Sequence, residues 1–97
     1  MSNSLKTKET EYLCKAFMSL ENEEECFNLL CDLCSAAEIE EMGRRMTAAK
    51  MLVEGEKYNN VAAATGLSTA TISRVNRCIK YGNDGYTAVL SRMVNKK

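Results

Sequence analysis

The sequence predicts an all-α fold of six helices that includes a helix-turn-helix. The chain of 97 residues contains no proline. Its apolar residues recur at helical three- and four-residue steps rather than in strand-like alternation. A turn centred on Gly66 joins two short helical segments whose facing positions are small or apolar. The length fits one domain, 1–97, and so short a chain buries only about two-thirds of its unfolded surface, which favours association between copies.

Three helices are expected before residue 57. The apolar stripe of the first consists of Tyr12, Leu13, Ala16, Phe17 and Leu20. Asn22 is expected to cap the second helix, with Glu25 three residues later in a variant of the capping box. Ser35 and Glu38 form a capping box that opens the third helix. This helix is the longest, at about 19 residues, and Gly55 ends it.

The helix-turn-helix is expected at residues 58–81. Four apolar positions should hold its two helices together: Val61, Leu67, Ile72 and Val75. Ala62 lies where the helices approach most closely, so a larger side chain there would separate them. Gly66 suits a left-handed conformation at the end of the first helix, and Ser68 can cap the second.

A last amphipathic helix is expected after a turn at residues 83–85. Its apolar stripe consists of Tyr86, Val89, Leu90, Met93 and Val94, and the terminal residues Asn95, Lys96 and Lys97 are expected to fray. This helix and the first two carry more apolar surface than the helix-turn-helix can cover. That surface can be buried in a bundle within one chain or against a second copy. We expect a homodimer, because two recognition helices about 34–36 Å apart multiply affinity and specificity for DNA.

Charge is distributed unevenly, although the formal net charge is zero. Residues 1–57 hold twelve acidic and seven basic residues, a net charge of −5. Residues 58–97 hold one acidic and six basic residues, a net charge of +5. A basic half that contains the helix-turn-helix is typical of a small DNA-binding protein with an acidic assembly region. We therefore assign residues 58–81 to a DNA-reading head, and residues 1–57 and 83–95 to a helical dimerisation core.

The five cysteines are interpreted as small core side chains rather than as a metal or redox site. They are Cys14, Cys26, Cys31, Cys34 and Cys78. Cys31 and Cys34 have the spacing of a CxxC pair, but the chain has neither a histidine nor a second such pair to complete a zinc site. Both thiols lie on the apolar stripe of the second helix. A thiol switch through this pair is kept as an alternative function.

Several other classes of protein are not expected. No apolar run approaches the ~20 residues of a membrane span, and no apolar block follows the N-terminal lysines, so we expect a cytoplasmic protein. Catalysis is not expected either, because histidine is absent and no carboxylate pair lies beside a nucleophile. No metal or cofactor is expected.

Helical geometry predicts the DNA-binding surface. Burial of Ile72 and Val75 turns the opposite face of the second helix outward. Its first residues, Thr69 and Ala70, are expected nearest the base edges, and Ser73 is expected to read bases directly or through water. The candidate DNA-binding residues are Asn59, Asn60, Ser68, Thr69, Ala70, Thr71, Ser73, Arg74, Arg77 and Lys80. Among them, the basic side chains and the asparagines are expected to contact phosphates.

From Glu24 to Val94 the chain resembles the Trp repressor superfamily, and specifically its TrpR-related YerC/YecD branch. The resemblance rests on four short segments, DLC at 32–34, EIE at 38–40, GRRM at 43–46 and LVEG at 52–55. Above all, it rests on TGLSTATISRVNRC at 65–78, followed by YGNDGY at 81–86. It implies six helices in an intertwined dimer, with the fourth and fifth helices as the DNA-reading head.

In Trp repressor, bound tryptophan sets the separation of the reading heads, and the resemblance implies a similar pocket here. The arginines that sandwich the indole match Arg45 and Arg74, and a hydroxyl residue near the start of the long helix matches Ser35. Cys78 replaces a hydroxyl that helps to hold the ligand, and Val75 replaces a glycine that leaves room for it. Steric overlap costs about 1–3 kcal/mol and the lost polar partner about 0.5–1.5 kcal/mol. We therefore expect no tryptophan corepressor, and the polar positions are kept as a candidate pocket for another small effector.

The predicted function is that of a sequence-specific transcriptional regulator, a repressor that occupies a palindromic operator in double-stranded DNA as a homodimer. One alternative is a helix-turn-helix module that docks on partner proteins, for which the acidic face at residues 21–25 is suited. The other is a repressor controlled by a different small effector.

Overall fold

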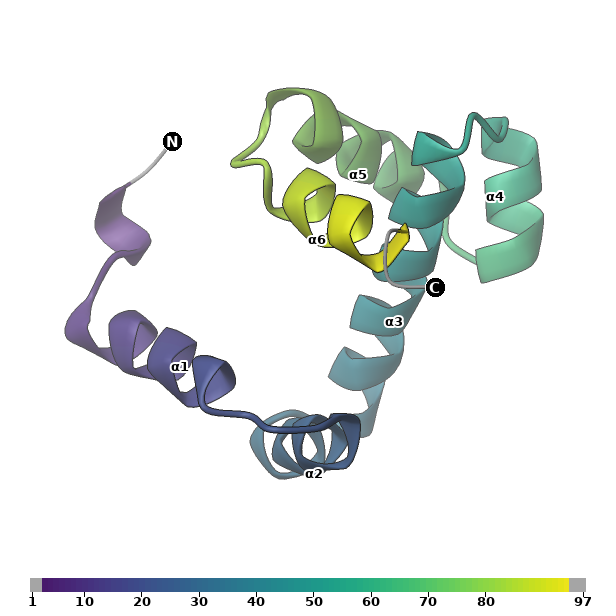
Figure 1. The fold of residues 1–97 in the computed structure, drawn as a ribbon. Coiled ribbons are helices and arrows are strands. Elements are labelled where there is room, and N and C mark those ends of the chain that lie inside the picture. Colours follow the sequence, from purple (N-terminus) through teal and green to yellow (C-terminus); the bar gives the residue numbers. More distant parts are fainter. Residues whose placement is uncertain (1–2, 95–97) are drawn as a thin grey trace. The chain divides into compact units, whose positions relative to one another are not determined.

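The computed structural model describes residues 3–94, which form six α-helices and no strand after a 3₁₀ turn at Asn3–Leu5 (Figure 1). The helices are α1 Lys8–Met18, α2 Glu23–Leu33, α3 Ala36–Val53, α4 Tyr58–Thr65, α5 Thr69–Tyr81 and α6 Gly85–Val94. The predicted all-α fold is confirmed. The three residues expected to fray, 95–97, lie outside the described part of the chain.

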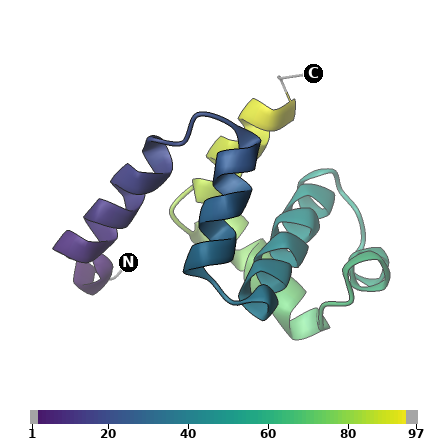
Figure 2. The ribbon, with the colours of Figure 1, turned by 90° about the horizontal axis from the view of Figure 1, so that it is seen from below.

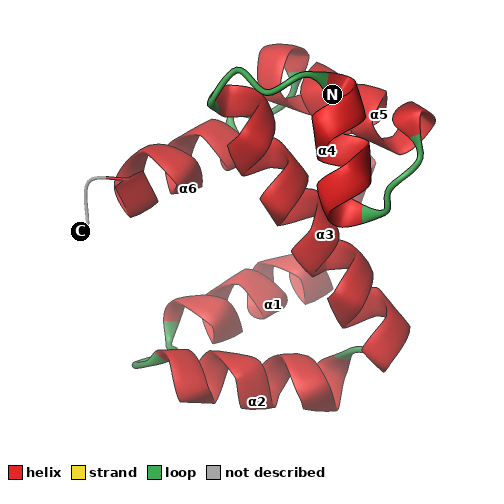
Figure 3. Cartoon of the chain, turned by 90° about the vertical axis from the view of Figure 1, so that its right-hand side faces the viewer, coloured by secondary structure: helices red, strands yellow, loops and turns green. Residues whose placement is uncertain are grey.

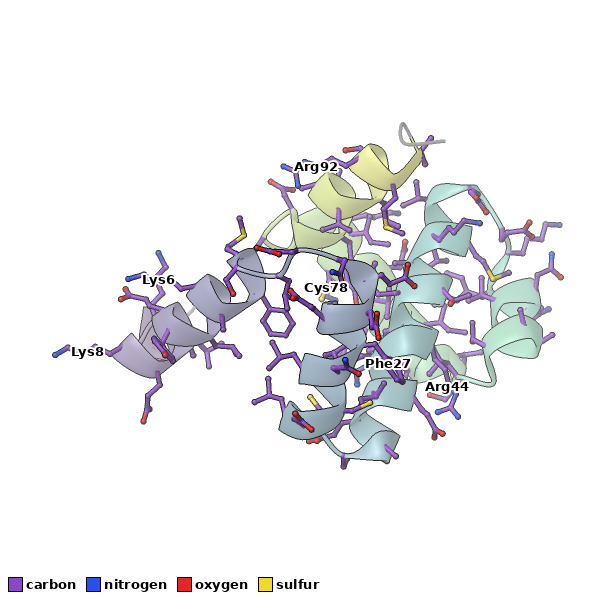
Figure 4. All side chains as sticks on the ribbon, turned by 60° about the horizontal axis from the view of Figure 1, so that its bottom comes forward. Lys6, Lys8, Phe27, Arg44, Cys78 and Arg92 are labelled. Atoms are coloured by element: carbon purple, nitrogen blue, oxygen red, sulfur yellow. The ribbon has the colours of Figure 1, made fainter. Side chains whose placement is uncertain are left out.

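The chain divides into two compact units, Met1–Ile39 and Glu40–Lys97. The first contains α1 and α2, which a short connection joins into a helical hairpin (Figures 2 and 3). Neither of these helices has a buried residue. Tyr12 is 76% exposed, Met18 84% and Phe27 58%, while Lys6 and Lys8 point away from the ribbon at the start of α1 (Figure 4). The apolar stripes expected here are therefore only partly covered: Phe17, Leu20 and Leu30 are half-buried, whereas Tyr12 and Phe27 are mostly exposed.

Side-chain caps begin α2 and α3. The Asn22 carboxamide oxygen accepts a hydrogen bond from the Glu25 N–H at 2.8 Å, as expected. The Glu25 carboxylate reaches back to the N–H of Glu21 at 2.9 Å, one residue before the cap. At α3, the Ser35 N–H donates to Glu38 at 2.7 Å and the Glu38 N–H donates to the Ser35 hydroxyl at 3.2 Å, so both bonds of the predicted capping box are present.

The C-terminal end of α3 is closed by backbone hydrogen bonds. The helix has 18 residues, close to the expected length. The Glu56 N–H donates to the Met51 carbonyl and the Gly55 N–H to the Leu52 carbonyl, both at 3.0 Å. These two bonds form a Schellman motif, which satisfies carbonyls that the last turn of a helix leaves open.

The second unit contains the buried core of the described residues, in two clusters. The first consists of Ala48, Val61, Leu67 and Ile72, and the second of Ala49, Val75 and Leu90. The two adjacent alanines of α3 thus belong to different clusters, and both are fully buried. Alanine lets other helices approach α3 closely, so that α4, α5 and α6 share its surface. The predicted burial of the four apolar helix-turn-helix positions is confirmed.

Two predicted boundaries are wrong. Leu20, expected on the apolar stripe of the first helix, lies beyond the end of α1 at Met18. Gly85 is the first residue of α6 rather than part of the preceding turn. The positive φ in this connection belongs to Asp84, at 65°. The Asp84 carbonyl accepts the first backbone bond of α6, from Ala88 N–H at 2.9 Å. Aspartate tolerates the left-handed region better than most residues, which leaves the glycine free to enter the helix.

Candidate nucleic-acid interface

The turn between α4 and α5 has the conformation that its sequence predicts. Gly66 has φ 76° and ψ 4°, in the left-handed region, and its N–H donates to the Ala62 carbonyl at 2.8 Å. The Ser68 hydroxyl accepts a hydrogen bond from the Thr71 N–H at 3.1 Å and so caps α5. These two devices end one helix and begin the next within three residues.

Thr65 adds a second constraint on this turn that sequence reasoning missed. It is the last residue of α4 and is buried. Its hydroxyl donates to the Val61 carbonyl at 2.7 Å and accepts from the Leu67 N–H at 3.2 Å. A polar residue beside a glycine usually indicates only a loop, but the four-residue step from Val61 places this threonine on the core face and could have revealed its burial.

The polar face of α5 opposite the core is open to solvent. Ile72 is fully buried and Val75 is 3% exposed, which turns the other side of the helix outward. The exposed candidates are Asn59, Asn60, Ser68, Thr69, Ala70, Ser73, Arg74, Arg77 and Lys80, and Thr71 is half-buried. Four of them, Ala70, Ser73, Arg74 and Arg77, line one open hollow of about 380 Å³ together with Cys78.

The two asparagines of α4 differ in their surroundings. The Asn60 Nδ2 donates to the Glu56 carboxylate at 3.1 Å, an interaction one helical turn apart. One of the two hydrogens of this amide is thus engaged with an acidic side chain, which leaves one for a phosphate. Asn59 is exposed. The sequence-based expectation treated the two as equivalent, because it could not assign the acceptor at Glu56.

Three of the four residues of the candidate effector pocket meet around one small cavity. The cavity measures about 40 Å³ and is lined by Arg45, Thr71, Arg74, Val75, Cys78 and Tyr86. A single water needs about 10–15 Å³ by this kind of measure, and benzene is held by a cavity of about 150 Å³. The space therefore suits a few waters and not an indole ring. Ser35 belongs to the other unit, where its hydroxyl caps α3.

Tyr86 is a residue of this cavity that the sequence analysis assigned only to an apolar stripe. Burial raises the pKa of its phenol, the nearby Cys78 raises it further, and Arg45 lowers it. The hydroxyl end of the ring therefore lies within electrostatic reach of both side chains. The Arg45 Nε also donates to the Glu41 carboxylate at 3.2 Å, so part of its guanidinium is engaged on α3.

The cysteines require a correction. All five are free thiols, and none is buried: Cys14, Cys31 and Cys78 are exposed, and Cys26 and Cys34 are half-buried. For the described residues of one chain, the interpretation as buried core side chains is therefore wrong. Among residues 3–94, no group of three or more cysteine, histidine or acidic side chains is placed to hold a metal ion. In the same range, no helix is long and apolar enough to cross a membrane.

The fold and its outward-facing α5 define a helix-turn-helix protein of the kind that presents its second helix to DNA. Residues 8–94 match the family described as Trp repressor protein. The chain belongs to this family, whose members are DNA-binding regulators rather than enzymes.

Similar proteins and structures support this membership. The chain is 44% identical over 91 residues to the uncharacterized protein YerC of Bacillus subtilis (strain 168), a match that covers 94% of this chain and 88% of that protein. The structure of a TrpR-like protein from Eubacterium eligens matches with a TM-score of 0.90 and 46% identity, and covers 95% of each chain. A candidate Trp repressor from Staphylococcus aureus matches with a TM-score of 0.90 and 41% identity, over 96% of this chain and 94% of that one.

Proposed function

We propose that the chain is a sequence-specific transcriptional repressor of the cytoplasm, which occupies a palindromic operator as a homodimer without tryptophan as corepressor. The observation that carries the proposal is the composition of the exposed face of α5. Short polar side chains lie at its N-terminal end, and Arg74, Arg77 and Lys80 follow along the helix. This is the order in which a recognition helix meets base edges and then phosphates.

In this proposal the exposed residues have two kinds of role. Thr69 and Ala70 face base edges, where a hydroxyl bonds either a donor or an acceptor and a methyl group contacts thymine. Ser73 reads a base directly or through a water. Arg74, Arg77 and Lys80 neutralise phosphates, which makes binding strong at low salt and weak at high salt. Asn59 supplies an amide donor from α4.

The dimer is supported by the surface of the first unit. Its helices leave large apolar side chains such as Met18 and Phe27 mostly exposed. Exposed apolar surface of this kind indicates a partner, and a second copy would bring two reading heads to one operator. Absence of tryptophan sensing is supported by the buried Val75 and by the volume of about 40 Å³ beside it.

The first experiment is a salt series of binding to random duplex DNA. Arg77→Ala should weaken binding to all sequences and reduce the slope of log affinity against log salt by about one. Thr69→Ala should keep the slope and relax the preference at one base pair, as read by selection of bound sequences. Lys50→Ala is the matched control, because it removes one positive charge from α3, where Lys50 pairs with Glu54 at 3.2 Å.

The outcome separates this proposal from a protein-docking module. Binding that stays unchanged at low salt in both Arg77→Ala and Thr69→Ala, or no binding by the native chain, would count against DNA reading. Selection repeated with added tryptophan tests the corepressor. The chain has no tryptophan of its own, so indole emission in that titration reports the added ligand alone.

A further inference from the structure

We infer that Tyr86 is an internal spacer for the reading helix, and that its ring occupies the place of a latent site for a small phenol between α3, α5 and α6. The chain would then supply from its own sequence a group that holds α5 in position. This inference rests on the proposed function for its DNA readout. It deepens that function by naming Tyr86 as the residue that holds α5 in its DNA-reading position.

The packing around Tyr86 brings three helices together. The residue lies in the first turn of α6 and is half-buried against the cluster of Ala49, Val75 and Leu90. Ala49 comes from α3 and Val75 from α5, and neither carries an aromatic ring. Space that the side chains of two helices leave between them needs a side chain from a third element to fill it. Tyr86 is the aromatic residue packed against this cluster.

Tyr86 also borders a second, more polar set of side chains. Tyr86 lines the cavity of about 40 Å³ together with Arg45, Arg74, Thr71 and Cys78. The site therefore combines an apolar wall with groups that hydrogen-bond a hydroxyl. A ligand that replaced the ring would need the same combination, which is the chemistry of a phenol.

The connection between α5 and α6 holds the ring at a fixed distance from the reading helix. Gly82 N–H donates to the Cys78 carbonyl at 2.9 Å. A Cβ at Gly82 would collide with the same carbonyl, so the chain here approaches the end of α5 as closely as glycine allows. Asp84, at φ 65°, then directs the chain into α6. These contacts set where Tyr86 begins relative to α5.

Removal of the ring should therefore open a ligand site. The space of the phenol would join the existing cavity, and a cavity of about 150 Å³ is enough for benzene. Without the spacer, α5 would spend less time in its reading position. Affinity for DNA falls in proportion to the population of the competent state. A ligand that refills the space would restore both the position of α5 and the affinity for DNA.

The experiment compares Tyr86→Ala with the native chain, using 4-methylphenol as the probe because it matches the deleted side chain. Tyr86→Ala should bind duplex DNA roughly tenfold more weakly, with the salt slope unchanged. Millimolar 4-methylphenol should restore most of that affinity. Tyr86→Phe keeps the ring and loses only the hydroxyl, so it should lose less DNA affinity than Tyr86→Ala. Tyr81→Ala is the control, since it removes the same group from a position that is 82% exposed, and 4-methylphenol should change neither this variant nor the native protein.

A second readout needs no DNA. Amide hydrogen exchange in α5 should accelerate in Tyr86→Ala and slow again with 4-methylphenol, and calorimetry should detect saturable binding of the phenol to the variant. Where Tyr86→Ala does not fold, Tyr86→Leu replaces it for the exchange measurement: leucine keeps part of the apolar contacts, and exchange in α5 should still be faster than in the native chain. The inference is overturned by native-like exchange in the folded variant, or by the absence of 4-methylphenol binding to folded Tyr86→Ala. A native chain that fails to bind DNA would instead refute the proposed function, and the exchange data would still decide the role of Tyr86.

Discussion

The two units of the chain differ in how they use their apolar residues. In the second, Val61 and Ile72 are fully buried and hold α4 and α5 together within one chain. In the first, Met18 and Phe27 are 84% and 58% exposed. A unit with a buried core is stabilised by its own contacts at any protein concentration. A unit with exposed apolar side chains gains stability when a partner binds, so its stability depends on protein concentration. The comparison supports the proposed division into a self-contained reading head and assembly helices that gain stability from a partner.

The largest expected effect tests the self-contained core. Ile72→Ala should lower the free energy of unfolding by about 2–5 kcal/mol, because it removes a fully buried aliphatic side chain and leaves a cavity. Urea unfolding followed by circular dichroism measures the change. Val89→Ala is the matched control, since that residue is 42% exposed, and its effect should be clearly smaller. Equal losses in the two variants would contradict a core centred on Ile72.

The next effect tests the proposed dimer. Phe27→Asp places a charge on the uncovered face of α2 and should raise the dimer dissociation constant at least about thirtyfold, the cost of losing an interface residue worth about 2 kcal/mol. Sedimentation over a range of concentrations measures it. Asn28→Asp adds the same charge at the neighbouring exposed position and should act more weakly. A native chain that stays monomeric at high concentration would refute the dimer.

A smaller effect tests the turn of the head. Gly66→Ala should cost about 1–2 kcal/mol of stability, the penalty of a left-handed conformation for a residue with a Cβ. A Cβ at this position meets nothing within 4 Å, so the loss is conformational rather than steric. Gly85→Ala is the control, because the space there is also open and the residue begins a helix at an ordinary φ. Its thermal midpoint should stay the same or rise.

The smallest effect concerns the capping box at the start of α3. The Ser35 N–H, and then the Ser35 hydroxyl, lower the pKa of the Glu38 carboxyl below its ordinary value of 4.5. Because the folded-state pKa is the lower one, the carboxylate stabilises the fold above 4.5, and this contribution disappears as pH falls through the folded-state pKa. Glu38→Gln should therefore differ most from the native chain at neutral pH and converge with it in acid, as read by thermal unfolding. Glu40→Gln controls for the loss of one surface charge.

Features fixed by a few neighbouring residues could be predicted from the sequence. The capping box at Ser35, the left-handed Gly66 and the cap at Ser68 each depend on groups within four positions along the chain. The buried positions of the helix-turn-helix follow from helical periodicity in the same way. Of the candidate site, the outward orientation of Thr69 and Arg77 follows from the same periodicity.

The remaining features depend on contacts that no local pattern encodes. The cysteines of α2 lie on an apolar stripe, but periodicity does not reveal whether anything covers that stripe. Tyr86 belongs to the cavity because α6 packs against α5, which is a tertiary contact. The capping box at the start of α1, between Thr7 and Thr10, uses threonine where glutamate or glutamine is usual. The sequence therefore identified which face of each helix is apolar, but not which other helix packs against that face.

Thr65 makes the bend between α4 and α5 a rigid elbow. Opening the elbow would leave the Leu67 N–H without its partner beside the buried core, and a buried unpaired group of this kind costs about 1–3 kcal/mol. Tilting of α5 relative to α4 is therefore penalised. In the proposed dimer, tolerance to operator spacing would come from movement of whole heads, while discrimination within each half-site stays strict.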